Sequence, residues 1–220
     1  MFSCSIAPYG PSEEVRNEGS IPVPLTAYSG SELAPEKFTK YGRQESTRAN
    51  YSLLGPVLCL VLGRGGNVSR LIKALRKCYF FYMANRDTRK AGIYVKELSR
   101  AMMWVLDSEK AKADGVSVFN MSMNLGPSTE EYVNSIARKS KIWVWIPNVP
   151  SMILFIIAYS IDFIARPLAI SHPFSPVRIR KLIRSNNILP AYLVENRYDY
   201  KYTLVEAFSD LGKDYPEEWH

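Results

Sequence analysis

With 220 residues, the chain has the length of one domain, or of a domain with an added lobe. Apolar residues make up 47% of it and aromatic residues 12%, which excludes an intrinsically disordered chain. The net charge of +7 is spread out and no nucleic-acid-binding motif accompanies it, so it indicates a solvated basic surface or a preference for polyphosphates or anionic membranes. The three cysteines and two histidines lack metal-ligand spacing, which predicts no metal site and a reducing compartment.

The start of the chain holds two hydroxyl groups in a pattern typical of proton-transfer chemistry. The run FSCSIAPYG predicts a short buried strand with Ser5 at its end, where a side chain can point into a crevice. The prolines and charges of Pro8–Pro24 indicate a loop, and Tyr28, within TAYSGSEL, opens the next helix. A serine and a tyrosine placed in this way can exchange a proton with a substrate alcohol while a hydride moves elsewhere.

The next segment predicts a helix, a buried strand and a second helix. Residues Ser31–Arg48 predict a helix that begins near Pro35, because proline is tolerated in the first turn and not in the interior. Tyr51–Leu62 is a continuous apolar run, typical of a strand buried on both faces of a parallel sheet. The loop Gly63–Asn67, which precedes the predicted helix Val68–Lys77, indicates a turn or, alternatively, a phosphate contact at a helix N-terminus.

Three further elements follow from residue spacing. Val95–Leu106 predicts an amphipathic helix with one apolar stripe. Val116–Asn120 predicts a short strand. Pro127–Arg138 predicts a helix that opens on a capping box, formed by Ser128 and Glu131.

The apolar stretch Ile142–Ile161 has 20 residues without a charge. Pro147 and Pro150 interrupt it, so it predicts a helix over Ser151–Ile161 that is too short to span a bilayer. We expect a buried or interfacial helix, and in the second case residues 143–161 would be a peripheral membrane contact.

Residues Ser171–Trp219 predict two more helices. The first carries the densest basic cluster of the sequence, which consists of Arg178, Arg180, Lys181 and Arg184. These positions do not all share one helix face, so we expect some of them to face solvent, and one or two are candidates for a phosphate contact. The second helix has Thr203 as its expected N-cap.

The succession of FSCSIAPYG and TAYSGSEL resembles the middle of the extended short-chain dehydrogenases/reductases, which include the NAD-dependent nucleotide-sugar epimerases and dehydratases. In that family a serine at the strand end and the tyrosine of a YxxxK motif are catalytic, which implies Ser5 and Tyr28. The resemblance also places Tyr28, together with Pro56 of an RPxxxxGPG-like strand ending, at the cofactor. The lysine position of the motif holds Glu32, and a nearby carboxylate disfavours a phenolate.

The resemblance also has implications for the substrate side and for the fold. Arg89 or Lys90 falls where many members place an arginine on the substrate diphosphate, and Arg178 belongs to the same set of phosphate-binding candidates. The implied fold is α/β, with a partial Rossmann-like parallel sheet in residues 1–66. Residues 67–220 would form a mixed, mainly helical C-terminal substrate lobe.

Three functions compete. The first is an NAD(P)-dependent epimerase/dehydratase-like protein that acts on a nucleotide sugar, or descends from an enzyme that does. It is expected to be truncated and impaired, because the GxxGxxG half and the YxxxK lysine are missing. The second is a substrate-binding part whose cofactor half another chain supplies. The third is a non-catalytic membrane-associated or partner-binding protein built on the substrate lobe.

The implied cofactor is NAD or NADP. The expected partners are a nucleotide sugar and a second copy or a companion chain, and nucleic acid is not expected. The predicted strands at Phe2–Ala7 and Ser52–Leu62 would leave a strand edge uncovered, which predicts association with a second copy or a companion chain. We expect a cytoplasmic protein, peripheral to the membrane in the case that residues 143–161 contact it.

Overall fold

The computed structural model describes residues 2–3, 5–42, 51–56, 58–60, 66–108, 116–142, 145–165 and 176–219. Its strands are β1 (Phe2–Ser3), β2 (Ser12–Arg16), β3 (Tyr51–Pro56), β4 (Leu58–Leu60), β5 (Tyr82–Met83), β6 (Gly92–Tyr94), β7 (Val116–Met121), β8 (Asn148–Val149) and β9 (Asn186–Ile188). Its α-helices are α1 (Ala27–Gly42), α2 (Asn67–Arg76), α3 (Val95–Leu106), α5 (Thr129–Ser140), α6 (Ser151–Ala165), α7 (Pro176–Ile183), α8 (Ala191–Glu195) and α9 (Leu204–Asp214). Two 3-10 helices complete the described elements, η1 (Ala7–Tyr9) and η2 (Pro216–Glu218).

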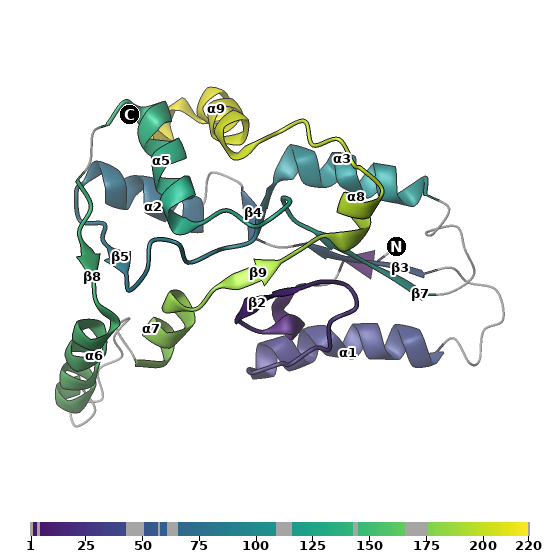
Figure 1. Cartoon of the computed structure of the whole chain (residues 1–220), viewed down its shortest axis with the longest axis horizontal. Helices are drawn as coiled ribbons and strands as arrows, with labels where there is room; N and C mark the ends of the chain where they lie inside the picture. Colours follow the sequence, from purple (N-terminus) through teal and green to yellow (C-terminus); the bar gives the residue numbers. More distant parts are fainter. Residues whose placement is uncertain are drawn as a thin grey trace.

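A parallel sheet of three strands, in the order β1-β3-β7, lies between α1 and α3 in the view of Figure 1. Phe2 of β1 pairs with Leu53 of β3, and Leu53 pairs on its other side with Val118 of β7. Parallel strands need long crossover connections, and here these contain helices, as in a Rossmann-like sheet. The predicted α/β class with a partial Rossmann-like sheet is therefore confirmed. Because β3 has a neighbour on each side, the two edge strands of this sheet, within the described part of the chain, are β1 and β7.

The predicted strand over Tyr51–Leu62 consists of two strands that pair separately. β3 pairs with β7, whereas Leu58 of β4 pairs with Gly92 of β6. Residues 57, 61 and 62, and the side chains of 51–60, lie outside the described part of the chain. The extended backbone of this segment and its parallel pairing thus agree with the prediction. The burial of both faces of the strand stays a prediction.

Two local predictions are wrong. Helix α1 starts at Ala27 and continues past Pro35, which the sequence placed near the helix start. One proline removes a single N–H donor, and the remaining helical hydrogen bonds of α1 outweigh that loss. The segment Pro8–Pro24, predicted as a loop, contains η1 and strand β2, which pairs in parallel with β9. The pairing joins Ser12 to Asn186, so no local pattern marks it.

Other predicted elements are confirmed within two residues at each end. They are the helix over 68–77 (α2), the helix over 95–106 (α3), the strand over 116–120 (β7) and the helix over 127–138 (α5). Both predicted N-caps are present, because Ser128 with Glu131, and Thr203 with Glu206, form capping boxes. Residues 63–65 of the loop Gly63–Asn67 lie outside the described part of the chain.

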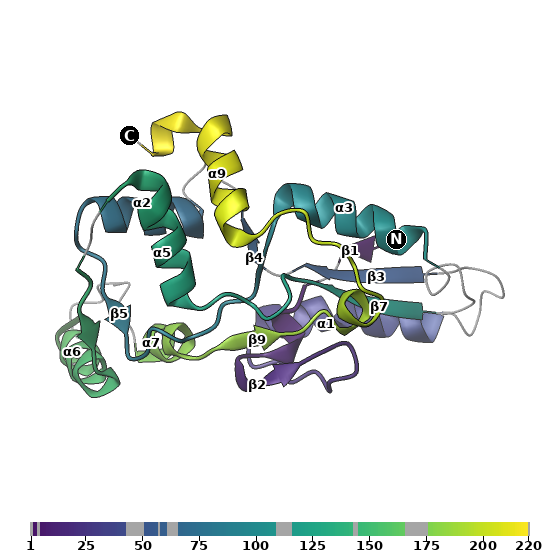
Figure 2. The ribbon, with the colours of Figure 1, turned by 45° about the horizontal axis from the view of Figure 1, so that its top comes forward.

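Two large apolar clusters form the core. The first joins α2, α5 and α9, and its fully buried members include Ile72, Ile136 and Phe208. Figure 2 shows α5 and α9 side by side at the end of the molecule where the chain terminates. The second lies under α3, where Ala101 and Val105 face Phe119 and Met121 of β7. The apolar stripe predicted for α3 is the side of the helix that faces this cluster.

Helix α6 packs against α7 through a small third cluster of Leu154, Ala158 and Ile179. The prediction of a helix after Pro150 is confirmed, and the helix extends four residues further, to Ala165. Among the described helices, none is both long and apolar enough to cross a membrane.

Candidate functional site

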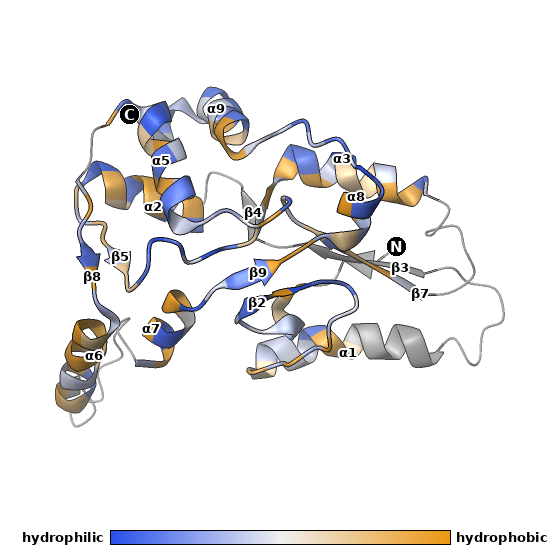
Figure 3. Ribbon diagram, viewed as in Figure 1, coloured by the Kyte–Doolittle hydropathy of each residue, from blue (hydrophilic) through white to orange (hydrophobic). Residues whose placement is uncertain are grey.

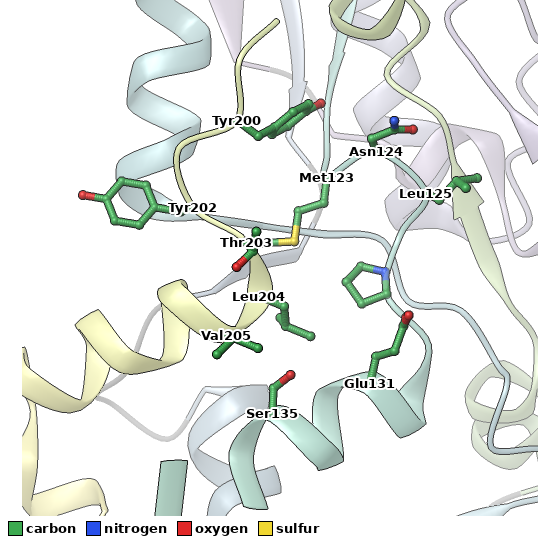
Figure 4. Close-up of a pocket in the computed structure, with 11 residues that line it drawn as sticks. Met123, Asn124, Leu125, Glu131, Ser135, Tyr200, Tyr202, Thr203, Leu204 and Val205 are labelled. Atoms are coloured by element: carbon green, nitrogen blue, oxygen red, sulfur yellow. The ribbon is translucent and has the colours of Figure 1, made fainter. Parts of the chain in front are cut away.

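A cavity of about 420 Å³ opens at the carboxyl end of β7 (Figure 4). Its walls come from the loop after β7, from the first turns of α5, and from the chain that enters α9. The residues that line it are Met123, Asn124, Leu125, Pro127, Glu131, Ser135, Tyr200, Tyr202, Thr203, Leu204 and Val205. Ligands of open parallel sheets bind beyond the carboxyl ends of the strands, so the position favours a binding site.

Hydrogen bonds and one close backbone contact hold these walls in place. The Tyr200 hydroxyl donates to the carbonyl of Ser122 at 2.9 Å, and burial raises the pKa of Tyr200, so the hydroxyl remains a donor. The Ser128 capping box fixes the start of α5. A Cβ atom at Gly126 would lie 2.7 Å from Cα of Ala91, so this position requires glycine.

Next to this wall lies a group that we call the Arg89–Lys90 junction, made up of Glu13, Arg89, Lys90, Arg184 and Ser185. One guanidinium nitrogen of Arg89 donates to the Gly126 carbonyl at 2.9 Å, and the Arg89 backbone N–H donates to Ser185 Oγ at 3.3 Å. Lys90 Nζ donates to the Arg184 carbonyl at 2.7 Å. The flanking Leu125 and Pro127 line the cavity, so Arg89 is anchored directly behind the cavity wall.

The junction carries more positive than negative charge. Glu13 Oε1 accepts the backbone N–H of Ser185 at 2.9 Å. Hydrogen bonds from Ser185 lower the pKa of Glu13, and the charges of Lys90 and Arg184 act in the same direction. Glu13 is therefore a carboxylate at neutral pH and offsets one of the three cations. The remaining charge suits an anionic ligand such as a phosphate.

Of the predicted phosphate-binding residues, the structure brings together Arg89 and Lys90 and leaves Arg178 apart. Arg178 lies in the first turn of α7, six residues before Arg184. At the helical rise of about 1.5 Å per residue, six residues correspond to a separation of about 9 Å. The basic cluster predicted on this helix is thus divided, with only its carboxyl end at the junction.

The structure places Ser5 and Tyr28 on neighbouring elements. Ser5 follows β1, and its Oγ accepts the backbone N–H of Ala7 at 3.1 Å. Tyr28 lies in the first turn of α1, which packs against η1, and it is 62% exposed. Its hydroxyl has no hydrogen bond to any described residue, so it is accessible to a ligand. Glu32 lies one turn further along α1, on the same helix face as Tyr28.

Pro56 ends β3 and pairs with Met121 at the end of β7. Its side chain lies outside the described part of the chain. Since the strands are parallel, the carboxyl ends of β1, β3 and β7 share one edge of the sheet. Ser5, Pro56 and the loop that begins at Ser122 therefore belong to the same edge, which is the edge with the cavity.

Sequence reasoning missed the residues that build this edge. Glu18 accepts the backbone N–H groups of Asn120 at 3.1 Å and Ala191 at 3.0 Å, and so ties the loop after β2 to β7 and α8. No local signal marks Glu18. The two tyrosines of the cavity, Tyr200 and Tyr202, had a signal, because they belong to the alternating run YDYKY.

The chain matches no family model and no curated protein. It does resemble solved structures. It superposes on UDP-glucose 4-epimerase from Thermotoga maritima, solved with UDP-glucose, with a TM-score of 0.67 and 15% identity over 99% of this chain and 62% of that one. For UDP-N-acetylglucosamine 4-epimerase from Bacillus cereus the TM-score is 0.66, with 16% identity over 95% of this chain and 63% of that one.

A human epimerase family protein, solved with NADPH, gives a TM-score of 0.64 and 14% identity over 96% of this chain and 64% of that one. The chain thus spans a little under two thirds of the length of these structures. At such identities the likeness concerns the fold: nearly all of this chain shares the fold of the corresponding part of nucleotide-sugar epimerases.

Proposed function

We propose that this chain is an NAD(P)-dependent epimerase/dehydratase-like protein that binds a nucleotide sugar at the carboxyl edge of its sheet, with impaired turnover. The observation that carries the proposal is the anchoring of Arg89 behind the wall of the 420 Å³ cavity, through its 2.9 Å bond to Gly126. A cationic group and a tyrosine-lined cavity side by side suit a ligand with a diphosphate and a ring. Two solved structures of this fold hold UDP-glucose.

The recognition chemistry follows from the side chains. An arginine has five N–H donors. The hydrogen bond of the Arg89 side chain to the Gly126 carbonyl uses one nitrogen, so a diphosphate can bind to other donors of the guanidinium as a bidentate partner. Lys90 adds a point charge. The tyrosine rings of the cavity offer apolar faces for a base or a sugar.

The fit to NAD or NADP is incomplete. The hydroxyls of Ser5 and Tyr28 and the strand end at Pro56 suit a nicotinamide cofactor at this edge. Glu32 does not, because the motif that the sequence resembles has a lysine at this position, and a carboxylate one turn from Tyr28 cannot supply its positive charge. We therefore derive no hydride step, and assign to Tyr28 and Ser5 hydrogen bonds to a substrate hydroxyl.

The test is calorimetric titration of the whole chain with UDP-glucose, UDP and glucose. We expect micromolar binding of UDP-glucose, and a loss of at least tenfold in Arg89→Gln. Arg70→Gln, which changes an exposed arginine on α2, is the matched control and should bind as the wild type does. An absence of binding up to millimolar UDP-glucose, or equal binding by Arg89→Gln, would contradict the proposal.

Cofactor binding is followed separately through the fluorescence of NADH and NADPH. We expect weak binding by the wild type and tighter binding by Glu32→Lys, since the substitution removes a negative charge beside Tyr28 and adds a positive one. Glu14→Lys, which makes the same charge change at an exposed site on β2, is the control. Equal affinity of Glu32→Lys and wild type would show that Glu32 does not limit cofactor binding.

A further inference from the structure

Helix α6 turns its apolar side toward solvent. Seven large apolar side chains of the helix are exposed: Met152, Ile153, Ile156, Ile157, Tyr159, Phe163 and Ile164. At 3.6 residues per turn these seven positions, with the exposed Ser160, fall within an arc of about 160°. The opposite arc holds the buried Leu154 and Ala158, which pack against α7. Figure 3 shows α6 as a largely hydrophobic helix at one extremity of the molecule.

Monomeric soluble proteins rarely leave a large continuous apolar face to water. Phe163 is 82% exposed and Met152 is 74% exposed, and they lie three turns apart on the same face. Within the exposed arc there is no carboxylate, and Ser160 is its one polar residue. Such a face gains free energy when an apolar phase covers it, at roughly 25 cal/mol per Å².

The neighbouring residues indicate which phase covers it. The exposed Arg180 lies on α7, which packs directly against α6, and the exposed Arg184 follows directly after the end of α7. Val177, 76% exposed, lies in the first turn of α7, before both arginines. Trp145, 77% exposed, precedes α6 in the chain. An apolar helix flanked by arginines and an exposed tryptophan combines the features that favour the interface of an anionic bilayer.

The length of α6 excludes a transmembrane arrangement for it. Fifteen residues extend over about 22 Å, and the hydrocarbon core of a bilayer is about 30 Å thick. We propose that α6 lies in the plane of the lipid–water interface of an anionic membrane, with its exposed face among the acyl chains and with Arg180 and Arg184 at the lipid phosphates.

Vesicle co-sedimentation of the full chain tests the proposal. Vesicles of phosphatidylcholine with about a third phosphatidylglycerol should bind the chain, and the double variant Ile156→Glu/Phe163→Glu should bind at least tenfold less. Met103→Glu, which puts the same charge at a 64% exposed methionine on α3, is the matched control and should bind as the wild type does. Circular dichroism verifies that each variant is folded.

Charge and orientation have their own measurements. Arg180→Gln/Arg184→Gln should lose several-fold in binding to the anionic vesicles, since each basic residue near such a surface contributes about 1 kcal/mol, or roughly fivefold. Dibrominated lipids should quench tryptophan fluorescence, and Trp145→Phe should lose part of the quenching.

The alternative occupant of the face is a second copy of the chain. Light scattering without lipid would reveal it as a dimer that Ile156→Glu/Phe163→Glu dissociates. That result together with an absence of vesicle binding would overturn the membrane proposal, as would equal vesicle binding by the double variant and the wild type.

Discussion

Glu97 and Tyr198 share a 2.5 Å hydrogen bond inside the protein, in which the tyrosine hydroxyl donates to Oε1 of a carboxylate with no exposed surface. The same carboxylate accepts the backbone N–H of Tyr202 at 2.7 Å and a guanidinium N–H of Arg100 at 3.0 Å. These bonds attach α3 to the segment that supplies the cavity tyrosines. A buried charge is tolerated only when it is bonded in this way.

Tyr198→Phe should therefore destabilise the protein by about 2 kcal/mol, because a hydrogen bond to a charged group is lost inside the core. Urea unfolding followed by circular dichroism measures the change. Tyr79→Phe, at a 60% exposed tyrosine, is the control and should leave the unfolding midpoint in place. Equal midpoints for the two variants would mean that the Glu97 network does not contribute to stability.

Gly126→Ala should destabilise by about 1–3 kcal/mol, since its Cβ would lie 2.7 Å from the Ala91 Cα and 3.0 Å from the Ala91 nitrogen. Backbone atoms cannot move aside as the end of a flexible side chain can. Gly30→Ala is the matched substitution, because Gly30 is helical and no atom beyond its chain neighbours and the nearby backbone of its own helix lies within 4 Å of its Cβ position. It should stabilise by a few tenths of a kcal/mol to about 1 kcal/mol. Urea midpoints compare the two, and the opposite order would contradict the packing described at Gly126.

Local signals predicted much of this structure. The capping boxes at Ser128 and Thr203, and the apolar stripe of α3, depend on residues three or four positions apart, and these are confirmed. The failures concern contacts between distant residues. Glu18 bonds to residues 102 and 173 positions away, and β2 pairs with a strand near the other end of the chain. No pattern within a short window carries such information.

In the candidate site, too, the sequence predicted some of the residues and did not predict the contacts between distant segments. Arg89 and Lys90 were selected by resemblance, whereas their connection to the cavity depends on Gly126 and Ser185, which bring three chain segments together. The sequence placed Arg178 in the same set, although the helix that carries it reaches the junction only at its other end. The exposure of the apolar face of α6 is likewise a property of tertiary packing, because the sequence allows either a buried or an interfacial helix.

Acid should weaken the protein partly through Glu13. The pKa of Glu13 is lowered in the folded state by its bonds to Ser185, so its contribution to stability is present above its ordinary pKa near 4.5. It is lost as the pH falls from about 5 through the lowered folded pKa. Glu13→Gln should accordingly lose less stability than the wild type between pH 6 and pH 3, by under about 1 kcal/mol because the group is exposed. Urea midpoints at both pH values measure this.

The control for this pH experiment is Glu14→Gln, which changes a neighbouring carboxylate with an 85% exposed side chain. It should show the pH dependence of the wild type. A pH dependence of Glu13→Gln that is identical to that of Glu14→Gln would show that the Ser185 bonds do not stabilise the charged form.

Alkaline unfolding should report the buried tyrosines. Burial is the main cause that raises the folded-state pKa of four tyrosines, Tyr94, Tyr132, Tyr198 and Tyr200. Their contribution to stability is complete below pH 10, the ordinary pKa, and is lost as the pH rises toward the folded-state values. Absorbance at about 295 nm should show exposed tyrosines such as Tyr79 ionising near pH 10, and a later, steeper step that coincides with the loss of circular dichroism. Tyr198→Phe should shift the later step to lower pH, because this substitution weakens the core around Glu97. A single smooth ionisation of all tyrosines in the wild type, with unchanged circular dichroism, would contradict their burial.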